Sequence, residues 1–348
     1  MTVYFDYKNL VSYLTADKNI IFADCNRMLK NKCRIRFNFD KNYLRRDSEQ
    51  DSLEILEIKQ SIMSWINTMT DGLGSDTSGN VSGVTFGEPF PPRKLKSNLY
   101  NSLSQEQLMS VYLLDDEAIC NIREYGFMLF GAPGDEIKVL NQLILDDDYQ
   151  FGVRLNIREM KDWKQLIQYA SPTTDIIFVD QYLFSAPEIM EYNATQLLKD
   201  LCKHAHNTKV NIIIFTTPSY YDKEKKTTFV PDWDNIRKTF KKAVGNTVGI
   251  EPNITFVLSS NLNEHDRQIF TNYKSFSSGD SMNYFNSKGF ISKGRYLHIN
   301  SVASKDILNQ NLMFLNDMQA IIQQVLKTNN EKMLIGDKKS CFLKFHKD

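Results

Sequence analysis

Three apolar runs of strand length, separated by helical patterns, constrain the fold of this 348-residue chain more than any other feature. The runs are 175–180 (DIIFVD), 210–216 (VNIIIFT) and 254–258 (ITFVL). The amphipathic stretches 194–204 and 233–244 lie between them. Strands that are apolar on both faces and alternate with helices are typical of a sheet covered on both sides. The sequence therefore predicts an α/β fold in which a mixed sheet is flanked by helices.

Chain length and local composition predict two domains, because one hydrophobic core seldom serves so long a chain. The acidic stretch 146–148 marks the expected boundary. Residues 1–147 are predicted to form a smaller α/β domain of unknown role, with a flexible Gly- and Ser-rich loop at 71–92. Residues 148–330 are predicted to form the second domain, and residues 331–348 a polar tail. Further predicted elements are strands at 2–6, 34–39, 111–114, 127–130, 149–157, 269–271 and 297–299, and helices at 53–69, 161–169 and 308–326.

The charge balance excludes a protein that coats nucleic acid through its overall charge. The sequence has 42 basic and 42 acidic residues, so its formal net charge is zero. Proteins that bind polyanions broadly are usually basic overall. Only a local basic patch is compatible with this composition.

The five cysteines are scattered and form no CxxC pair, which argues against a disulfide framework and against a structural zinc site. The first residues lack the pattern of a signal peptide, and no apolar run approaches the roughly 18 residues of a membrane span. We therefore expect a soluble cytoplasmic protein with no cofactor and no bound metal.

A spaced set of polar and small residues follows the strand at 254–258. The set comprises His265, Arg267, Asn272, Gly279, Asp280 and Asn283. Residues two apart on a strand point to the same face, so His265 and Arg267 would face one ligand together. There a histidine can attack phosphorus or protonate a leaving oxygen, while a cation neutralises the phosphoryl oxygens. Gly279 would let backbone N–H groups approach the same anion.

The spacing of this set resembles the motif of phospholipase D enzymes and related nucleases, which reads His-x-Lys-x4-Asp-x6-Gly-Ser/Thr-x2-Asn. The spacing agrees throughout, and the residue types agree at His265, Gly279 and Asn283. At the other positions, Arg267 replaces the lysine of the motif and Asn272 replaces its aspartate. Asp280 replaces its serine or threonine. Arginine still binds phosphate, but with a different geometry from lysine, and an aspartate repels phosphate unless it is paired. The resemblance implies a degenerate HKD motif, as in a pseudoenzyme.

The His-Asp-Arg version at 265–267 also resembles the C-terminal domain of microtubule-interacting and trafficking (MIT) proteins. That resemblance implies a phospholipase-D-like fold that binds a head group rather than cleaving it. The strand end IIFVDQYLFS, with Asp180 and Tyr182, is similar to the Asp-x-Tyr strand end of those domains. The resemblance covers about residues 151–326, while the N-terminal part resembles no family. In the alternative interpretation the motif is a surface loop in which Asp266 forms an ion pair with a neighbouring basic side chain.

Taken together, the resemblance implies an intracellular accessory protein whose second domain binds a phosphate-containing ligand or a protein partner. All six residues of the set are expected to line the ligand site. Nucleic acid is favoured over lipid, because the chain shows neither a membrane segment nor a strongly basic composition.

Two alternatives stay open. The first is an active homodimeric phosphodiesterase or nuclease with His265 as catalytic nucleophile, in which the dimer supplies the second half-site. The second is a pure protein-assembly module that recognises its partner through the N-terminal domain and the loop at 71–92.

Overall fold

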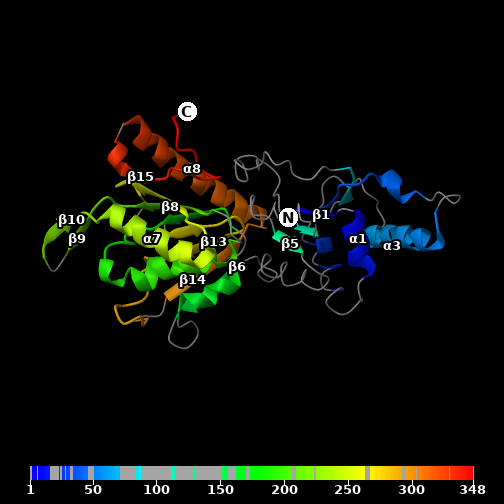
Figure 1. The fold of residues 1–348 in the computed structure, drawn as a ribbon, viewed down its shortest axis with the longest axis horizontal. Helices are drawn as coiled ribbons and strands as arrows, with labels where there is room; N and C mark the ends of the chain where they lie inside the picture. The colour runs from blue at the N-terminus through cyan, green and yellow to red at the C-terminus, as the bar shows by residue number, and fades with distance from the viewer. Residues whose placement is uncertain are drawn as a thin grey trace. The chain divides into compact units, whose positions relative to one another are not determined.

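A computed structural model of the chain describes residues 2–5, 7–15, 23, 26–27, 29–31, 34–45, 51–70, 84–87, 111–113, 128–130, 150–155, 162–169, 173–205, 209–222, 225–262, 267–291, 295–302, 304–328 and 330–347. The chain divides into two compact units (Figure 1). The first comprises Met1–Leu95 and Leu103–Gln142, and the second Lys96–Ser102 and Leu143–Asp348. Apart from its short segment at 96–102, the second unit begins a few residues before the expected boundary.

In its described residues, the first unit contains two short parallel sheets and the helices α1 and α3, beside shorter helical stretches. One sheet has the order β1-β2-β3 and the other pairs β4 with β5. The elements are β1 (Thr2–Phe5), α1 (Tyr7–Thr15), β2 (Arg34–Phe37), the 3-10 helix η1 (Lys41–Leu44), α3 (Leu53–Met69), β3 (Val84–Thr85), β4 (Val111–Leu113) and β5 (Met128–Phe130). The predicted helix at 53–69 is confirmed. Of the predicted loop at 71–92, residues 71–83 and 88–92 lie outside the described residues.

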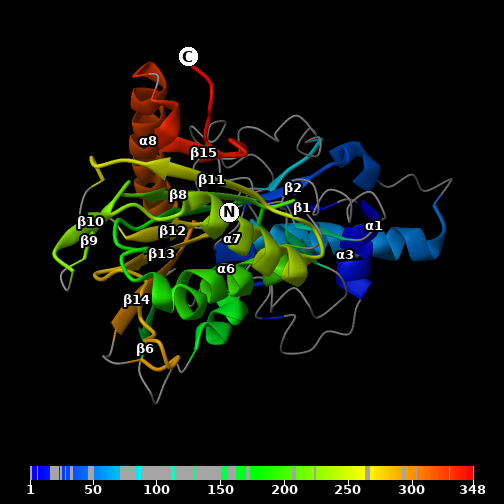
Figure 2. The same ribbon diagram turned by 60° about the vertical axis from the view of Figure 1, so that its left-hand side comes forward.

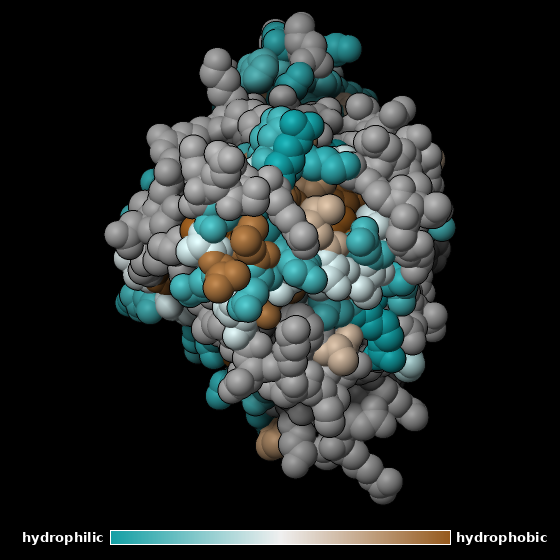
Figure 3. All heavy atoms as spheres, turned by 90° about the vertical axis from the view of Figure 1, so that its right-hand side faces the viewer, coloured by the Kyte–Doolittle hydropathy of each residue, from teal (hydrophilic) through white to brown (hydrophobic). Residues whose placement is uncertain are grey.

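Aromatic side chains form the core of the first unit. The ring of Trp65 on α3 lies 6.0 Å from the rings of both Phe5 and Tyr13. The side-chain oxygen of Asn26 accepts hydrogen bonds from the Trp65 indole at 2.7 Å and the Tyr13 hydroxyl at 3.0 Å. The strand β1 and both helices are therefore held by one aromatic cluster and one shared acceptor. Figure 3 views the side that carries α1 and α3, where hydrophobic side chains are scattered among hydrophilic ones, as is ordinary for a protein surface.

The second unit is built on an eight-stranded mixed sheet with the order β15-β11-β8-β7-β12-β13-β14-β6. Strands β7, β8 and β11 are parallel to one another, and every other neighbouring pair is antiparallel. The strands are β6 (Gln150–Leu155), β7 (Asp175–Val179), β8 (Asn211–Thr216), β11 (Asn253–Leu258), β12 (Gln268–Phe270), β13 (Lys274–Ser278), β14 (Arg295–Ser301) and β15 (Leu334–Gly336). A separate hairpin pairs β9 (Tyr220–Asp222) with β10 (Thr227–Phe229). The predicted α/β fold with a mixed sheet flanked by helices is confirmed.

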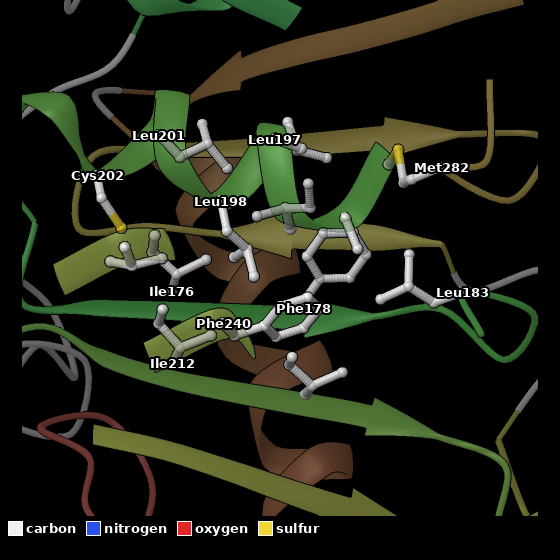
Figure 4. Packing of buried hydrophobic residues seen from close by; sticks show 14 of the residues in the cluster. Ile176, Phe178, Leu183, Leu197, Leu198, Leu201, Cys202, Ile212, Phe240 and Met282 are labelled. Atoms are coloured by element: carbon white, nitrogen blue, oxygen red, sulfur yellow. The ribbon is translucent and has the colours of Figure 1, made fainter. Parts of the chain in front are cut away.

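Helices cover both faces of this sheet (Figures 1, 2 and 4). The main helices are α6 (Gln196–Leu201), α7 (Trp233–Val248) and α8 (Lys305–Lys327). Alternate residues of β7 and β8, such as Phe178 and Ile212, pack with Leu198 of α6 and Phe240 of α7 in one buried cluster (Figure 4). On the other face, Phe270 lies 5.0 Å from Phe314 of α8. The near-continuous burial of the central strands follows from this double covering.

Side-chain caps fix where the three longest of the described helices begin. Ser52, Asp232 and Ser304 each accept a hydrogen bond from the backbone N–H three residues on, at the N-termini of α3, α7 and α8. Two predicted helices differ from the structure. The segment predicted at 161–169 is a 3-10 helix, η4 (Trp163–Tyr169), and the one predicted at 194–204 follows a π-helix, η6 (Glu191–Thr195), and ends in a 3-10 turn, η7 (Cys202–His204).

The C-terminal segment differs from the predicted polar tail. After the 3-10 helix η8 (Glu331–Met333), strand β15 pairs with β11 at the edge of the sheet. The side-chain amide of Gln319 on α8 then donates to the carbonyl of Lys344. Buried side chains such as Phe342 and Leu343 explain why this lysine-rich segment is held against the sheet and α8.

Candidate functional site

Four of the six residues of the predicted set meet at one edge of the sheet, where the parallel strands end. Arg267 precedes β12, and the register of Gln268 with Val179 places it beside the end of β7. The Ser278 N–H donates to the Arg267 carbonyl at 3.1 Å, so the turn that holds Gly279 and Asp280 starts beside Arg267. Asn283 follows in the same turn, and it contacts the segment after β7. Ligands of open α/β sheets commonly bind at the carboxyl ends of the strands.

Asp180, directly after β7, organises this edge. Its carboxylate is fully buried and accepts hydrogen bonds from the Tyr182 N–H at 2.9 Å, and from the Ser281 hydroxyl and Met282 N–H at 2.7 Å each. Burial raises the pKa of the Asp180 carboxyl, while the bonds from Met282 and Ser281 and the charge of Arg267 oppose that rise. One carboxylate therefore fixes two loops that are about a hundred residues apart in the sequence.

Arg267 is half-buried, and its guanidinium is oriented by two neighbours. The Cζ atom of Arg267 lies 5.6 Å from the centre of the Tyr182 ring, and one terminal nitrogen of the guanidinium donates a hydrogen bond to the Gly279 carbonyl. Its Nε is buried and has no hydrogen-bond partner among the residues that the structure describes. Within that same part of the chain, no carboxylate forms an ion pair with Arg267. The guanidinium thus contacts two neutral groups, lies near enough to Asp180 to influence its pKa, and has one buried donor without a partner among the described residues.

Asn283 joins the turn to the segment after β7 and has an acceptor to spare. Its side-chain amide donates to the Tyr182 carbonyl at 2.8 Å. Its Oδ1 is buried without a partner in the described parts of the chain. Tyr182 therefore contacts Asp180, Arg267 and Asn283 through its N–H, its ring and its carbonyl.

The turn itself is open at Gly279. A Cβ built on Gly279 would meet no atom within 4 Å, and the residue does not require a left-handed backbone. Asp280 is exposed, and its N–H donates to the Ser278 hydroxyl at 3.1 Å. That hydroxyl also bonds to Tyr284, whose ring stacks on Trp163 at 5.2 Å. The turn is therefore held from the protein side while its outer side is accessible.

Asn272 does not join this site. It lies in the turn between β12 and β13, at the opposite edge of the sheet from Arg267. Its side chain is buried, accepts from the Thr174 N–H at 2.9 Å and donates to the Thr174 hydroxyl at 3.1 Å. Because β12 is only three residues long, positions five apart fall at its two ends. The geometry gives Asn272 a part in closing the far edge of the sheet.

His265 and Asp266 lie outside the described residues. The structure adds Asp180, Tyr182 and Ser281 to the site, none of which the spaced motif contains. A polar residue that ends a buried strand, as in DIIFVD, is the feature of the sequence that points to Asp180.

The described residues contain no group of three or more His, Cys, Asp or Glu side chains arranged to hold a metal ion. Among the described helices, none has the length and apolar character needed to cross a membrane.

Comparisons with known proteins find only distant similarity. No family model and no curated protein matches the chain. Among solved structures, a phosphatidylserine synthase from Haemophilus influenzae is similar with a TM-score of 0.28 and 10% sequence identity. The similarity covers 54% of this chain, which spans 40% of the synthase. A likeness of this degree carries no argument about activity.

Proposed function

We propose that the second unit is a phospholipase-D-like binding domain whose site beside Asp180 and Arg267 takes a phosphate group of its ligand. The proposal rests on the contacts of the Arg267 side chain. Its guanidinium is oriented by Tyr182 and by the Gly279 carbonyl, and its buried Nε has no partner among the described residues. An arginine that forms no ion pair among the described residues is suited to charge-assisted hydrogen bonds with a phosphate.

His265 is two residues from Arg267 in the sequence. Two residues of extended chain span at most about 7 Å, which limits the distance between the two Cα atoms. We propose that His265 contacts the same phosphate and that the open turn at Gly279 admits it. Asn283, with its unpartnered Oδ1, would accept a hydrogen bond from a hydroxyl or a water of the ligand.

The substitutions in the motif favour binding over hydrolysis. Arginine keeps its proton and spreads its charge, whereas the lysine of the phospholipase D motif is a compact point charge. An active enzyme would also need a second half-site, which only a homodimer of this chain would supply.

We propose nucleic acid, rather than lipid, as the ligand. Strand β14 carries Tyr296, which is 51% exposed and lies 5.0 Å from His298 ring to ring. The register Ser278 with Leu297 places Tyr296 beside Gly279, on the face of the sheet opposite Arg267 but at the same edge. A single strand crossing this edge would present a phosphate to Arg267 and a base to Tyr296. Exposed aromatic rings suit base stacking, which a lipid head group does not offer.

The test compares two ligands with three variants. Binding of a fluorescent single-stranded oligonucleotide, and of vesicles containing phosphatidic acid, is measured with the full chain at fixed salt. We expect the oligonucleotide to bind, Arg267→Ala to weaken it at least tenfold, and His265→Ala to weaken it less. The control Lys238→Ala removes one exposed cation elsewhere and should bind like the unaltered protein.

Equal binding by Arg267→Ala and the unaltered protein would remove the basis of the proposal. Stronger binding to vesicles would assign the site to lipid. Hydrolysis of a phosphodiester that is lost in His265→Ala would establish the enzyme instead. Thermal unfolding of each variant separates lost contacts from a damaged fold.

A further inference from the structure

A second cationic feature lies at the other end of the strands of the same sheet, where the parallel strands begin. Residues 338–347 (KKSCFLKFHK) contain four lysines and one histidine and no acidic residue. We name residues 338–346 the basic loop; they follow β15 and Asp337 and run beside α8 (Figures 1 and 2). None of the motif residues of the first site belongs to this segment.

A buried carboxylate anchors the middle of the basic loop. Asp175, at the start of β7, is fully buried and accepts hydrogen bonds from the Ser340 hydroxyl at 2.6 Å and the Cys341 N–H at 2.8 Å. The Ser340 oxygen in turn accepts from the N–H groups of Phe342 and Leu343, at 3.0 Å each. The turn at 340–343 is thus tied to the centre of the sheet.

Helix α8 holds the second half of the basic loop. The Gln319 side chain accepts from the Lys344 N–H at 2.7 Å and donates to the Lys344 carbonyl at 2.9 Å. Gln323 donates to the His346 carbonyl at 3.0 Å. The backbone of the loop is therefore fixed before any ligand arrives, which lowers the entropic cost of binding.

The cations of this fixed loop lack acidic partners. Lys338, Lys339 and Lys344 are exposed and form no ion pair with any residue in the described parts of the chain. The adjacent Asp337 is engaged with Arg237 at 2.6 Å and with Lys241 at 3.0 Å. Like charges held in a rigid loop repel one another, so an anion that joins them would stabilise the arrangement.

The loop also borders a pocket that is open to solvent. A cavity of about 720 Å³ is lined by the basic loop and Asn211. This volume falls within the roughly 300–1,000 Å³ of small-molecule sites. Phe345, half-buried in the lining, supplies an apolar surface beside the cations.

We propose that this cavity is a binding site for a small anion with several phosphate groups, held by Lys338, Lys339, Lys344 and His346. Lysine binds phosphate as a point charge, and a group of cations requires a ligand with more than one negative charge. The size of the cavity favours a compact ligand over a polymer. The site does not depend on the function proposed for Arg267, because the two lie at opposite edges of the sheet.

The probe is sodium tripolyphosphate, titrated by calorimetry into the full chain at about 100 mM salt; adenosine triphosphate and a short oligonucleotide are the comparison ligands. We expect tripolyphosphate and the triphosphate to bind, and the double substitution Lys338→Gln with Lys344→Gln to weaken both at least tenfold. The control pair Lys288→Gln and Lys332→Gln removes two exposed charges elsewhere and should have no effect. Arg267→Ala should also bind tripolyphosphate normally.

The proposal is overturned if tripolyphosphate does not bind, if the control pair weakens binding equally, or if Arg267→Ala abolishes it. It is also overturned if the oligonucleotide binds more tightly than tripolyphosphate and is the ligand lost in the double variant. Should the double variant fail to fold, Lys344→Arg provides the second test. That variant keeps the charge, so retained binding supports the proposal and lost binding contradicts it.

Discussion

Asp175 and Asp180 lie at the two ends of strand β7, and each buried carboxylate accepts a backbone N–H from a distant segment. Cys341 donates to Asp175 and Met282 to Asp180. Burial raises the pKa of both carboxyls, while hydrogen bonds from these segments oppose the rise. One strand thereby organises both candidate sites, one at each edge of the sheet.

Removal of Asp175 should release the basic loop. In Asp175→Ala, the Ser340 hydroxyl and the Cys341 N–H lose their acceptor, and a buried donor without a partner costs about 1–3 kcal/mol. We expect a lower melting temperature and faster hydrogen exchange at 338–346. Ser340→Ala, which removes one hydroxyl but leaves the carboxylate, should have a smaller effect. Unchanged exchange in Asp175→Ala would show that α8 alone holds the loop.

The buried carboxyl of Asp180 predicts a particular dependence of stability on pH. Its pKa is higher in the folded state than the ordinary value of 3.8, so the folded protein binds the proton more tightly. Its stabilising contribution is complete below about pH 3.8 and is lost as pH rises through the folded-state pKa. Relative to Asp180→Asn, the unaltered protein should therefore gain stability as pH falls through that range. A constant difference in melting temperature between pH 4 and pH 8 would contradict the prediction.

Lys274 on β13 is a fully buried amine that should make the stability of the second unit depend on pH. Burial lowers the pKa of its amine from 10.5 to about 7. Because the unfolded chain holds this proton up to higher pH, stability should rise as pH increases from about 7 towards 10.5. Lys274→Met removes the titrating amine, so the unaltered protein should gain stability relative to this variant between pH 7 and pH 9.5. Denaturant unfolding at both pH values measures this, and an equal difference in stability at pH 7 and pH 9.5 would contradict the prediction.

Two glycines should respond in opposite ways to alanine. A Cβ on Gly336 would lie 2.0 Å from the Ile254 carbonyl oxygen, and its φ of +119° disfavours other residues. We expect Gly336→Ala to lose at least about 2 kcal/mol of stability. A Cβ on Gly279 would meet nothing within 4 Å, so Gly279→Ala should unfold at nearly the same temperature. Equal losses from the two substitutions would argue against this placement of β15.

Tyr296 should contribute to nucleic-acid binding if bases stack on β14. Tyr296→Ala should weaken oligonucleotide binding about five- to tenfold, since stacking on an aromatic ring is worth roughly 1–3 kcal/mol per base. Tyr221→Ala is the matched control, because Tyr221 is 62% exposed on the separate β9–β10 hairpin. An equal effect of both substitutions would point to nonspecific contact. No effect of Tyr296→Ala would confine the ligand to the face of Arg267.

The sequence predicts well the strands and helices that have a clear apolar pattern. Helix α3 is apolar at helical spacing, strands β7, β8 and β11 are continuous apolar runs, and each lies close to its predicted range. Strand β13 (KSFSS) is not among the predicted strands, because a lysine and three serines hide its single large apolar residue, Phe276. Strand β15 escaped prediction for a related reason, since it is three residues long within a lysine-rich segment.

Part of the site was predictable because strands β12 and β13 pair as a hairpin, so residues that are spaced along the motif come together at its open end. That hairpin brings Arg267 to the turn at Gly279 and Asn283, as the spacing predicts. Spacing alone does not tell which end of a strand each residue occupies, so Asn272 falls at the far edge. The part played by Asp180 depends on a contact with Met282 across about a hundred residues of sequence, which no local pattern encodes.

The anchoring of Asp175 has a consequence for biosynthesis. Its carboxylate is buried at the start of the central strand, yet two of its hydrogen-bond donors, Ser340 and Cys341, are 165 and 166 residues further along the chain. While the ribosome is still making residues 180–330, that carboxylate cannot be both buried and fully paired. The second unit should therefore stay incompletely closed on the ribosome, exposed to chaperones, until its last turn emerges.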